Sequence, residues 1–134
     1  MAGYSGTPLL KKLGIQPSTK ILLINAPSDY DQLIETASVS LLAAKGTVPD
    51  LIHLFATTHE RFEKEMKGLE RFMKKNPAIV VWVSWYKKSS KIPTDITEDS
   101  IRNYALRHGW VDIKVCAVSD IWSGLKLVIP LKNR

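Results

Sequence analysis

The chain has very little cysteine, and its first residues lack the features of a secretory signal. Cys116 is the only cysteine among 134 residues, so an internal disulfide is excluded. Residues 1–6 contain neither the basic segment nor the apolar core of a signal peptide. Proteins without disulfides are typical of reducing compartments. We therefore expect a cytoplasmic protein, in which Cys116 lies in an apolar strand as a buried and inert thiol.

Long hydrophobic runs are also absent. No apolar stretch approaches the roughly 18 residues that a membrane-spanning helix requires, so we expect no membrane association. The composition, 45% hydrophobic and 24% charged, is that of an ordinary globular protein. A chain of 134 residues can bury a sizeable core without disulfides or metal. We expect a single Rossmann-like α/β domain over residues 1–134.

Glycine is missing where a dinucleotide-binding protein would carry it. The turn after the first predicted strand, residues 25–29, reads Asn-Ala-Pro-Ser-Asp. Without glycine the backbone cannot approach a pyrophosphate in the usual way, which argues against NAD or FAD bound in the standard mode. The glycine-rich residues 3–6 lack the spacing of a P-loop. We expect no cofactor.

The three histidines show no metal-binding or catalytic pattern. His53 lies in a predicted buried strand, His59 in the first turn of a predicted helix, and His108 at a helix end. No cluster of histidine, cysteine and acidic residues has zinc spacing, so no metal is expected. His59 beside Thr57 and Thr58 is the one arrangement from which a general base could be built, but it lacks an evident nucleophile or orienting acid.

The net charge of +6 is concentrated in the second part of the chain. Residues 1–57 hold four lysines and four acids, whereas residues 58–134 hold 15 basic and 9 acidic residues. A basic surface of this size is compatible with nucleic acid, phosphorylated metabolites or an acidic protein as partners. A solvated surface that happens to be basic explains the charge equally well.

The segment at residues 78–91 organises the predicted fold. Its first part, Ala-Ile-Val-Val-Trp-Val-Ser-Trp, is a run of apolar residues typical of a strand buried on both faces, as in parallel sheets covered by helices. Its second part is a basic and aromatic loop. A strand of this kind delivers its loop to the carboxyl edge of the sheet, where open α/β folds bind ligands.

Further elements follow from capping residues and periodicity. Before the central strand we expect strands at 20–25, 39–43 and 49–56, short helices at 7–14 and 28–36, and a long helix that begins with Thr57 and Glu60 as a capping box. After it we expect a helix capped by Thr97 and ended near Gly109, then strands at 113–118 and 125–131. The short link between these last strands requires an antiparallel pair. The predicted fold is a three-layer Rossmann-like α/β fold, similar to class I methyltransferases, with a mostly parallel sheet and a C-terminal antiparallel strand pair.

Several segments together resemble a family of small bacterial proteins of unknown function with a Rossmann-like fold. The segments are residues 4–9, 11–14, 23–27, 82–85, 87–89, 97–99, 111–118 and 122–126. The resemblance covers nearly the whole chain and is weakest over about residues 31 to 76. It implies a small bacterial cytoplasmic protein and transfers no active site.

Polar and basic residues follow three of the predicted parallel strands. The carboxyl ends of parallel strands share one edge of a sheet, and helix N-termini at that edge favour anions. The candidate ligand-binding residues at this edge are Asn25, Ser28, Thr57, Thr58, His59, Trp85, Lys87, Lys88 and Ser89. The alternative is that Lys87 and Lys88 are merely solvated and the tryptophans fill the core. Trp122 at the final hairpin is either an exposed contact surface or a buried loop anchor.

The sequence leaves three functions open. The first is a non-catalytic binding protein for an anionic small molecule or a protein partner at this edge. The second is a small transferase-like enzyme that uses the same edge on a nucleotide-like substrate. The third is a nucleic-acid-associated regulator that works through the basic C-terminal half, although no nucleic-acid-binding motif supports it.

Overall fold

The structure is a computed structural model in which residues 9–34 and 47–134 are described. Within these ranges none of the helices is long and apolar enough to cross a membrane. The elements follow the chain in the order α1 (Leu9–Leu13), β1 (Ile21–Ile24), α2 (Tyr30–Leu33), β2 (Leu51–Phe55), α3 (His59–Met73), β3 (Val80–Tyr86), the 3₁₀ turn η2 (Lys88–Ser90), α4 (Glu98–Arg107), β4 (Val111–Ala117), β5 (Trp122–Val128) and the 3₁₀ turn η3 (Leu131–Asn133).

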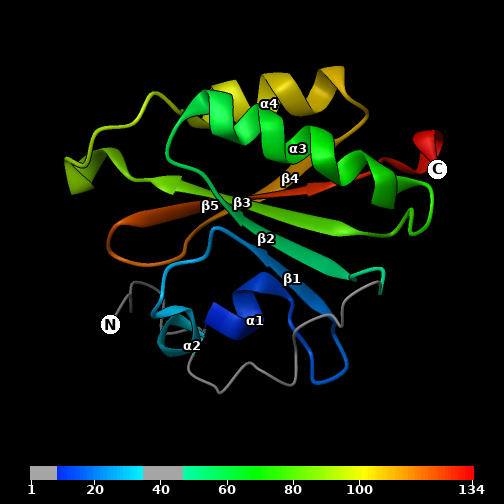
Figure 1. The fold of residues 1–134 in the computed structure, drawn as a ribbon, viewed down its shortest axis with the longest axis horizontal. Helices are drawn as coiled ribbons and strands as arrows, with labels where there is room; N and C mark the ends of the chain where they lie inside the picture. Colours follow the sequence, from blue (N-terminus) through cyan, green and yellow to red (C-terminus); the bar gives the residue numbers. More distant parts are fainter. Residues whose placement is uncertain (1–8, 35–46) are drawn as a thin grey trace.

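The described strands form one sheet in the order β1-β2-β3-β5-β4 (Figure 1). β1, β2 and β3 are parallel neighbours, while β5 is antiparallel to both β3 and β4. β4 therefore runs in the same direction as the first three strands, and β5 alone opposes them. This arrangement confirms the predicted mostly parallel sheet and its C-terminal antiparallel pair.

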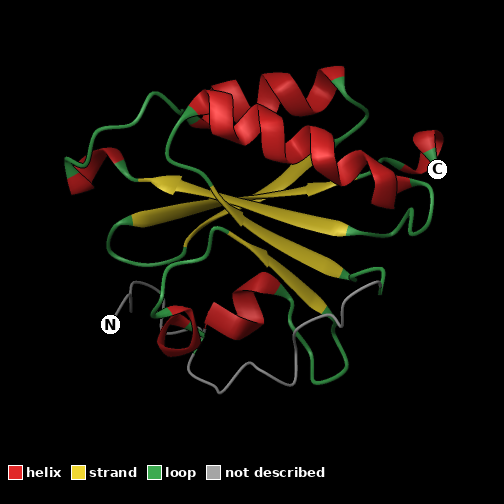
Figure 2. Cartoon of the chain, viewed as in Figure 1, coloured by secondary structure: helices red, strands yellow, loops and turns green. Residues whose placement is uncertain are grey.

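Helices cover both faces of the sheet. α3 and α4 lie on one face and α1 and α2 on the other, which gives the predicted three layers (Figures 1 and 2). β3 is buried from both sides: Val83 belongs to the apolar cluster beneath α3 and α4, whereas Trp82 belongs to the cluster beneath α1 and α2. The indole Nε1 of Trp82 donates a hydrogen bond to the carbonyl of Leu13 at 3.0 Å, which ties the end of α1 to the central strand.

Most predicted elements are present, with some shifted boundaries. The largest shift concerns the last strand, which was expected at residues 125–131 but spans Trp122–Val128. The Ser123-Gly124 pair reads as a turn signal in the sequence, yet Gly124 pairs with Ser84 inside the sheet. A Cβ at Gly124 would lie 2.9 Å from Val118 Cγ2 and 3.3 Å from the Trp82 ring, so glycine is required here by close packing. The strand expected at 39–43, the start of the first helix at Thr7 and the end of the second helix near Thr36 lie outside the described residues.

A buried polar chain crosses the interior on the α1 and α2 side. His53 is completely buried in β2, with Tyr30 Oη 2.9 Å from its Nδ1 and Ser84 Oγ 2.7 Å from its Nε2. Both ring nitrogens therefore have partners, as a buried imidazole requires. Burial lowers the pKa of His53 to about 3, so the ring is neutral at physiological pH. The hydrogen-bonded side chains of Tyr30, His53 and Ser84 therefore link α2, β2 and β3.

We predict that the Gly124→Ala substitution destabilises the protein by about 1 to 3 kcal/mol, because the new methyl group overpacks the core against Val118 and Trp82. Gly68 in α3 provides the control: the nearest atom to a Cβ there is Arg71 Nη1 at 3.8 Å, so Gly68→Ala should be neutral or slightly stabilising. Urea denaturation measures both. Equal effects of the two substitutions would contradict the close packing at Gly124.

We also predict that acid weakens the fold through His53. Because the unfolded imidazole has a pKa near 6.5 and the folded one near 3, the unfolded state binds the proton first as the pH falls. His53 therefore stabilises the fold above pH 6.5, and this stabilisation declines by up to about 1.4 kcal/mol for each pH unit below it.

The His53→Gln variant isolates this effect. Its free energy of unfolding should be lower than that of the wild type at pH 7, and the difference should shrink between pH 6.5 and pH 4 in urea titrations. A constant difference between wild type and His53→Gln over this range would refute the role of His53.

Candidate functional site

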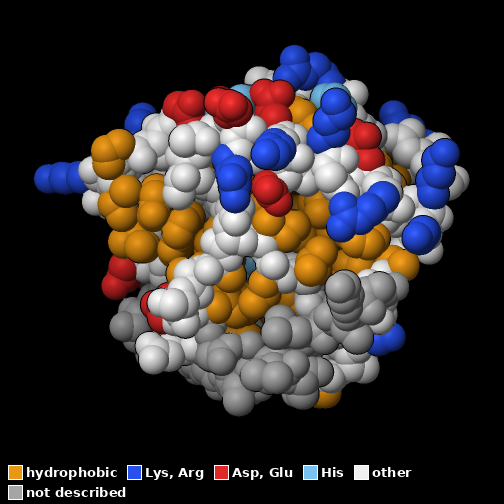
Figure 3. All heavy atoms as spheres, viewed as in Figure 1, with side chains coloured by type: hydrophobic (Ala, Val, Ile, Leu, Met, Phe, Trp, Pro, Cys, Tyr) orange, Lys and Arg blue, Asp and Glu red, His pale blue; other side chains and the backbone are white. Residues whose placement is uncertain are grey.

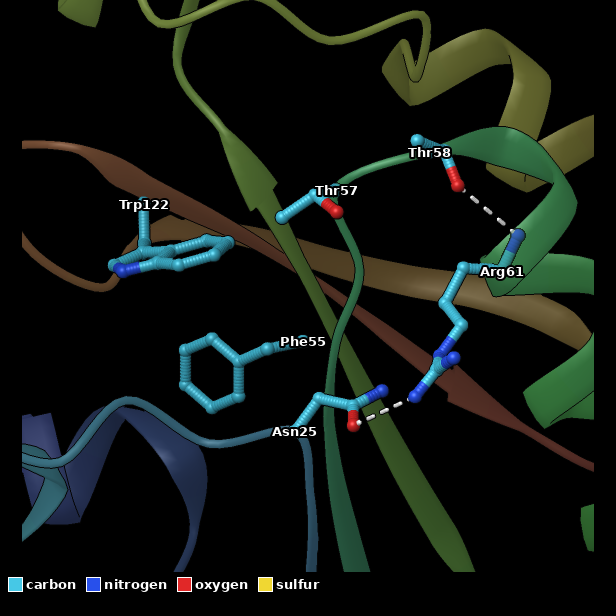
Figure 4. A pocket seen from close by; sticks show the side chains of 6 residues that line it. All are labelled: Asn25, Phe55, Thr57, Thr58, Arg61 and Trp122. Carbon is cyan, nitrogen blue, oxygen red and sulfur yellow. Dashed lines mark hydrogen bonds between the residues drawn. The ribbon is translucent and has the colours of Figure 1, made fainter.

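A cavity of about 300 Å³ opens at the carboxyl edge of the parallel strands. It lies where β1 and β2 end, and the described residues of its walls come from three separate segments of the chain, at Asn25, at residues 55–61 and at Trp122 (Figure 4). The residues that line it are Asn25, Phe55, Thr57, Thr58, Arg61 and Trp122. Open α/β sheets bind their ligands at this edge, in the crevice outside the carboxyl ends of the strands. This cavity is the candidate functional site.

Asn25 holds the first corner of the cavity in a constrained conformation. It directly follows β1 and has a φ of 57°, in the left-handed region. Asparagine is among the few non-glycine residues that adopt this region with little cost. The chain can therefore turn sharply out of the sheet here without glycine. Asn25 Oδ1 accepts a hydrogen bond from Arg61 Nη2 at 3.4 Å.

The start of α3 forms the second corner, and it is fixed by several contacts. Thr58 is the N-cap, with its hydroxyl accepting from the Arg61 N–H at 3.2 Å. The loop before α4 supports it: Asp95 Oδ1 accepts from the His59 N–H at 2.7 Å, and the Thr94 hydroxyl donates to the Thr57 carbonyl at 2.8 Å. The predicted capping box of Thr57 and Glu60 is therefore wrong by one residue. Either threonine could cap the helix locally, and the contacts of Thr94 and Asp95 decide which one does.

Arg61 carries the positive charge of the cavity. Its side chain is 52% exposed, and its ion pair with Glu65 spans 3.7 Å between Nε and Oε1. That distance and the 3.4 Å to Asn25 are both long compared with the usual 2.9 Å of a charge-assisted bond. The guanidinium is thus only loosely held, and its fork of donors can turn toward a carboxylate or phosphate.

Aromatic rings form the opposite wall. Phe55 and Trp122 meet edge to face with ring centroids 4.9 Å apart. Trp122 is stacked on Tyr86 at 4.3 Å, and Phe55 is stacked on His53 at 4.3 Å. The wall therefore continues into the buried chain of Tyr30, His53 and Ser84. Each ring packs against the next, and Phe55 and Trp122 are only 1% and 7% exposed, so the wall presents little open ring surface.

Three of the residues predicted from the sequence line this cavity: Asn25, Thr57 and Thr58. The other predicted residues lie elsewhere. Trp85 points to the opposite face, where it belongs to the cluster beneath α3 and α4. His59 Nε2 lies 2.7 Å from Glu63 Oε1, and His59 Nδ1 has no hydrogen-bond partner among the described residues.

Ser28 is exposed just before α2, and Lys88 and Ser89 are exposed in η2, beyond the end of β3 (Figure 1). The Lys87 N–H donates to the Ile121 carbonyl at 2.8 Å. None of these residues is among the six described residues that line the cavity. Their participation in binding stays a prediction.

Phe55, Arg61 and Trp122 were not predicted as binding residues. Phe55 reads as strand core, and Arg61 as one of many exposed charges on an amphipathic helix. A signal for Arg61 does exist in the sequence, because it lies in the first turn of the helix that follows a strand at the ligand-binding edge. Trp122 is 7% exposed, so it is mainly a buried anchor that still reaches the cavity.

The chemistry of the remaining candidates is limited. Within residues 9–34 and 47–134, no group of three or more histidine, cysteine or acidic side chains could hold a metal ion. Cys116 is partly buried, and burial raises the pKa of its thiol, which disfavours the reactive thiolate.

Comparison with solved structures identifies the fold. A protein of the NADB-Rossmann superfamily from Streptococcus agalactiae superposes with a TM-score of 0.54 at 10% sequence identity, over 95% of this chain and 71% of that one. Sp1610 of Streptococcus pneumoniae, provisionally assigned as a tRNA (m1A22) methyltransferase, gives a TM-score of 0.44 at 13% identity, over 96% of this chain and 60% of that one. No protein-family model and no curated protein sequence matches this chain. The chain thus has a Rossmann-like fold, and the resemblance to a family of small bacterial proteins stays a prediction.

The helix cap gives a direct test of this site geometry. We predict that Thr58→Ala lowers the free energy of unfolding by about 1 kcal/mol, because the Arg61 N–H loses its acceptor. Thr57→Ala should cost less, since the contact that Thr57 makes with Thr94 uses its backbone carbonyl. Chemical denaturation of the two variants compares them, and a larger loss for Thr57→Ala would contradict the cap at Thr58.

Proposed function

We propose that this protein binds an anionic small molecule in the cavity at the carboxyl edge of its sheet, without catalysing a reaction. The observation that carries the proposal is the presence, within about 300 Å³, of a loosely held arginine beside polar side chains and two packed aromatic rings. In a concave small-molecule site the polar groups fix the orientation of the ligand and provide specificity.

Arg61 is the group that selects an anion. The N-terminus of α3 would otherwise be an attractive anion site, but the Asp95 carboxylate already accepts from the His59 N–H. The positive end of this helix is therefore partly neutralised from within the protein. Arg61 remains the cationic side chain among the six described lining residues, and it can offer two parallel donors to a carboxylate or phosphate.

The lining supports binding better than catalysis. The six described residues include no histidine, cysteine, aspartate or glutamate, so none of these six can serve as a general base near neutral pH. The transferase-like alternative, acting on a nucleotide-like substrate, agrees with the Rossmann-like fold, but a fold hosts many functions. That alternative requires product formation from a bound ligand, which the binding proposal does not.

The basic residues beyond β3 belong to the proposal as an outer rim. Tyr86, which stacks on Trp122, directly precedes Lys87 in the chain. Lys87 and Lys88 would attract the anion at longer range, where salt screens the effect, and the neutral Ser89 hydroxyl would offer a hydrogen bond. On the face shown in Figure 3, by contrast, basic and acidic side chains are interspersed over α3 and α4. That mixture does not favour a nucleic-acid surface on this face.

Binding is tested by thermal shift with a panel of phosphorylated and carboxylated metabolites. A ligand that binds the folded state raises the melting temperature as its concentration increases. We predict that Arg61→Gln weakens binding at least about tenfold, as expected when a charge-assisted bond is lost. Arg71→Gln is the matched control, because Arg71 lies in the same helix but its guanidinium stacks over Phe72.

A Lys87→Gln, Lys88→Gln double variant tests the outer rim. It should reduce affinity only at low salt, whereas Arg61→Gln should reduce it at all salt concentrations. Equal losses in Arg61→Gln and Arg71→Gln would show that general charge, not the cavity, binds the anion. A retarded band with nucleic acid at low salt, without any small-molecule shift, would favour the regulator alternative.

A further inference from the structure

The accessible lining of the cavity is polar, although two aromatic rings border it. Phe55 and Trp122 are buried, whereas the exposed lining residues are Asn25, Thr57, Thr58 and Arg61. Figure 4 shows the two rings on one side of the cavity, Thr58 and Arg61 on the other, and Asn25 and Thr57 between them. A bound molecule therefore meets mainly these four polar side chains.

The four polar side chains offer hydrogen-bond donors to a ligand. The Asn25 side-chain oxygen already accepts from Arg61 Nη2, which leaves the amide N–H groups of Asn25 to donate. The Thr58 hydroxyl accepts from the Arg61 backbone N–H, so its own proton can be donated. Thr57 accepts from Thr94 through its backbone carbonyl, and its hydroxyl has no partner among the described residues. The lining is thus complementary to a group that only accepts hydrogen bonds.

A phosphoryl group uses these donors more fully than a carboxylate does. A carboxylate has two oxygens, and one guanidinium can bind both of them as a bidentate pair. The donors of Asn25, Thr57 and Thr58 would then receive no charged oxygen. An ionised phosphoryl group has three strong acceptor oxygens, so Arg61 and the neutral donors can bind it together.

The size of the cavity limits what the phosphoryl group is attached to. About 300 Å³ is at the lower end of the range for small-molecule pockets. The buried rings present little surface that could select an apolar part, and the exposed side chains around the cavity are polar. This space suits one phosphoryl group with a small polar carrier and excludes a dinucleotide.

We infer that the anion bound in this cavity is the phosphoryl group of a small phosphate monoester, held by the Arg61 guanidinium, the Asn25 amide and the hydroxyls of Thr57 and Thr58. Arg61 supplies the charge, and the three neutral residues supply the preference for phosphoryl over carboxylate. Asn25 can keep its bond to Arg61 while it donates from its amide nitrogen. This inference rests on the proposed function, because it names the anionic group that the cavity binds.

The first test compares matched ligands by calorimetry on the wild-type protein. Glycerol 3-phosphate, glycerate and glycerol share a small hydroxylated carbon chain and differ in the charged group. Glycerol 3-phosphate should bind at least about tenfold more tightly than glycerate, since the neutral donors add hydrogen bonds to charged oxygens. Glycerol should not bind measurably, because it offers Arg61 no charge.

The Thr57→Val variant separates the neutral donors from general charge. Valine keeps the branched shape of threonine and removes the hydroxyl, while the helix cap at Thr58 and the carbonyl bond to Thr94 remain. This variant should bind glycerol 3-phosphate about five- to tenfold more weakly and glycerate as well as the wild type does. Thr57→Ser keeps the hydroxyl and should bind both like the wild type. Melting temperatures without ligand check that both variants are folded.

The outcomes separate this inference from the function on which it rests. If glycerate binds as tightly as glycerol 3-phosphate, and Arg61→Gln weakens both, anion binding stands and the phosphoryl preference is wrong. If Thr57→Val weakens the two ligands equally, or weakens neither, the hydroxyl does not hold a phosphoryl group and the inference is again wrong. If neither probe and no anion of the thermal-shift panel binds, both proposals fail.

Discussion

The burial of β3 on both faces is the constraint on which the rest of the structure depends. This strand pairs with parallel β2 on one side and antiparallel β5 on the other, and its side chains enter both apolar clusters. Such a strand requires a helical layer on each side of the sheet, because the apolar side chains on both of its faces must be shielded from water. Trp82 satisfies its indole N–H through Leu13, so even the N-terminal helix α1 is positioned by β3.

The candidate site follows from this arrangement. Because β1 and β2 run parallel to β3, their carboxyl ends reach the same edge, where Asn25 and Thr57 border one cavity. The antiparallel insertion of β5 then brings Trp122 to the same place, opposite Tyr86 in the register. The cavity thus lies between the parallel and the antiparallel part of the sheet, and β2 and β5 each contribute one ring, Phe55 and Trp122, to its aromatic wall.

The sequence predicted the fold well because the signals for it are local. Apolar runs, the Thr97 cap and the glycine after α1 each depend on a few adjacent residues, and the structure contains all of them. The directions of the strands followed from the lengths of the links between them, since parallel strands need a long crossover and antiparallel strands do not. Where local signals were ambiguous, prediction failed. Ser123 and Gly124 were placed in the link before the last strand and Thr57 at the cap, because the packing of Gly124 against Val118 and the hydrogen bond of His59 to Asp95 cannot be inferred from adjacent residues.

The site was only partly predictable for the same reason. Asn25, Thr57 and Thr58 follow strands directly, so the parallel-sheet rule alone indicates them. Arg61 and Trp122 reach the cavity only through tertiary geometry: one depends on where α3 begins, and the other on the position of β5 beside β3. Trp85 and Lys88 follow the same strand rule but lie outside the lining, since Trp85 points to the opposite face and Lys88 lies in η2.

The most direct test of anion binding in this cavity is a nuclear magnetic resonance titration that follows the indole N–H signals of the four tryptophans. With the anion of the thermal-shift panel that binds most tightly as ligand, the account predicts that the Trp122 signal and the Asn25 side-chain amide shift with the same saturation curve. The signals of Trp85 and Trp110, which lie on the opposite face, should stay in place. Saturable shifts at Trp85 or Trp110 without any change at Trp122 would contradict the account.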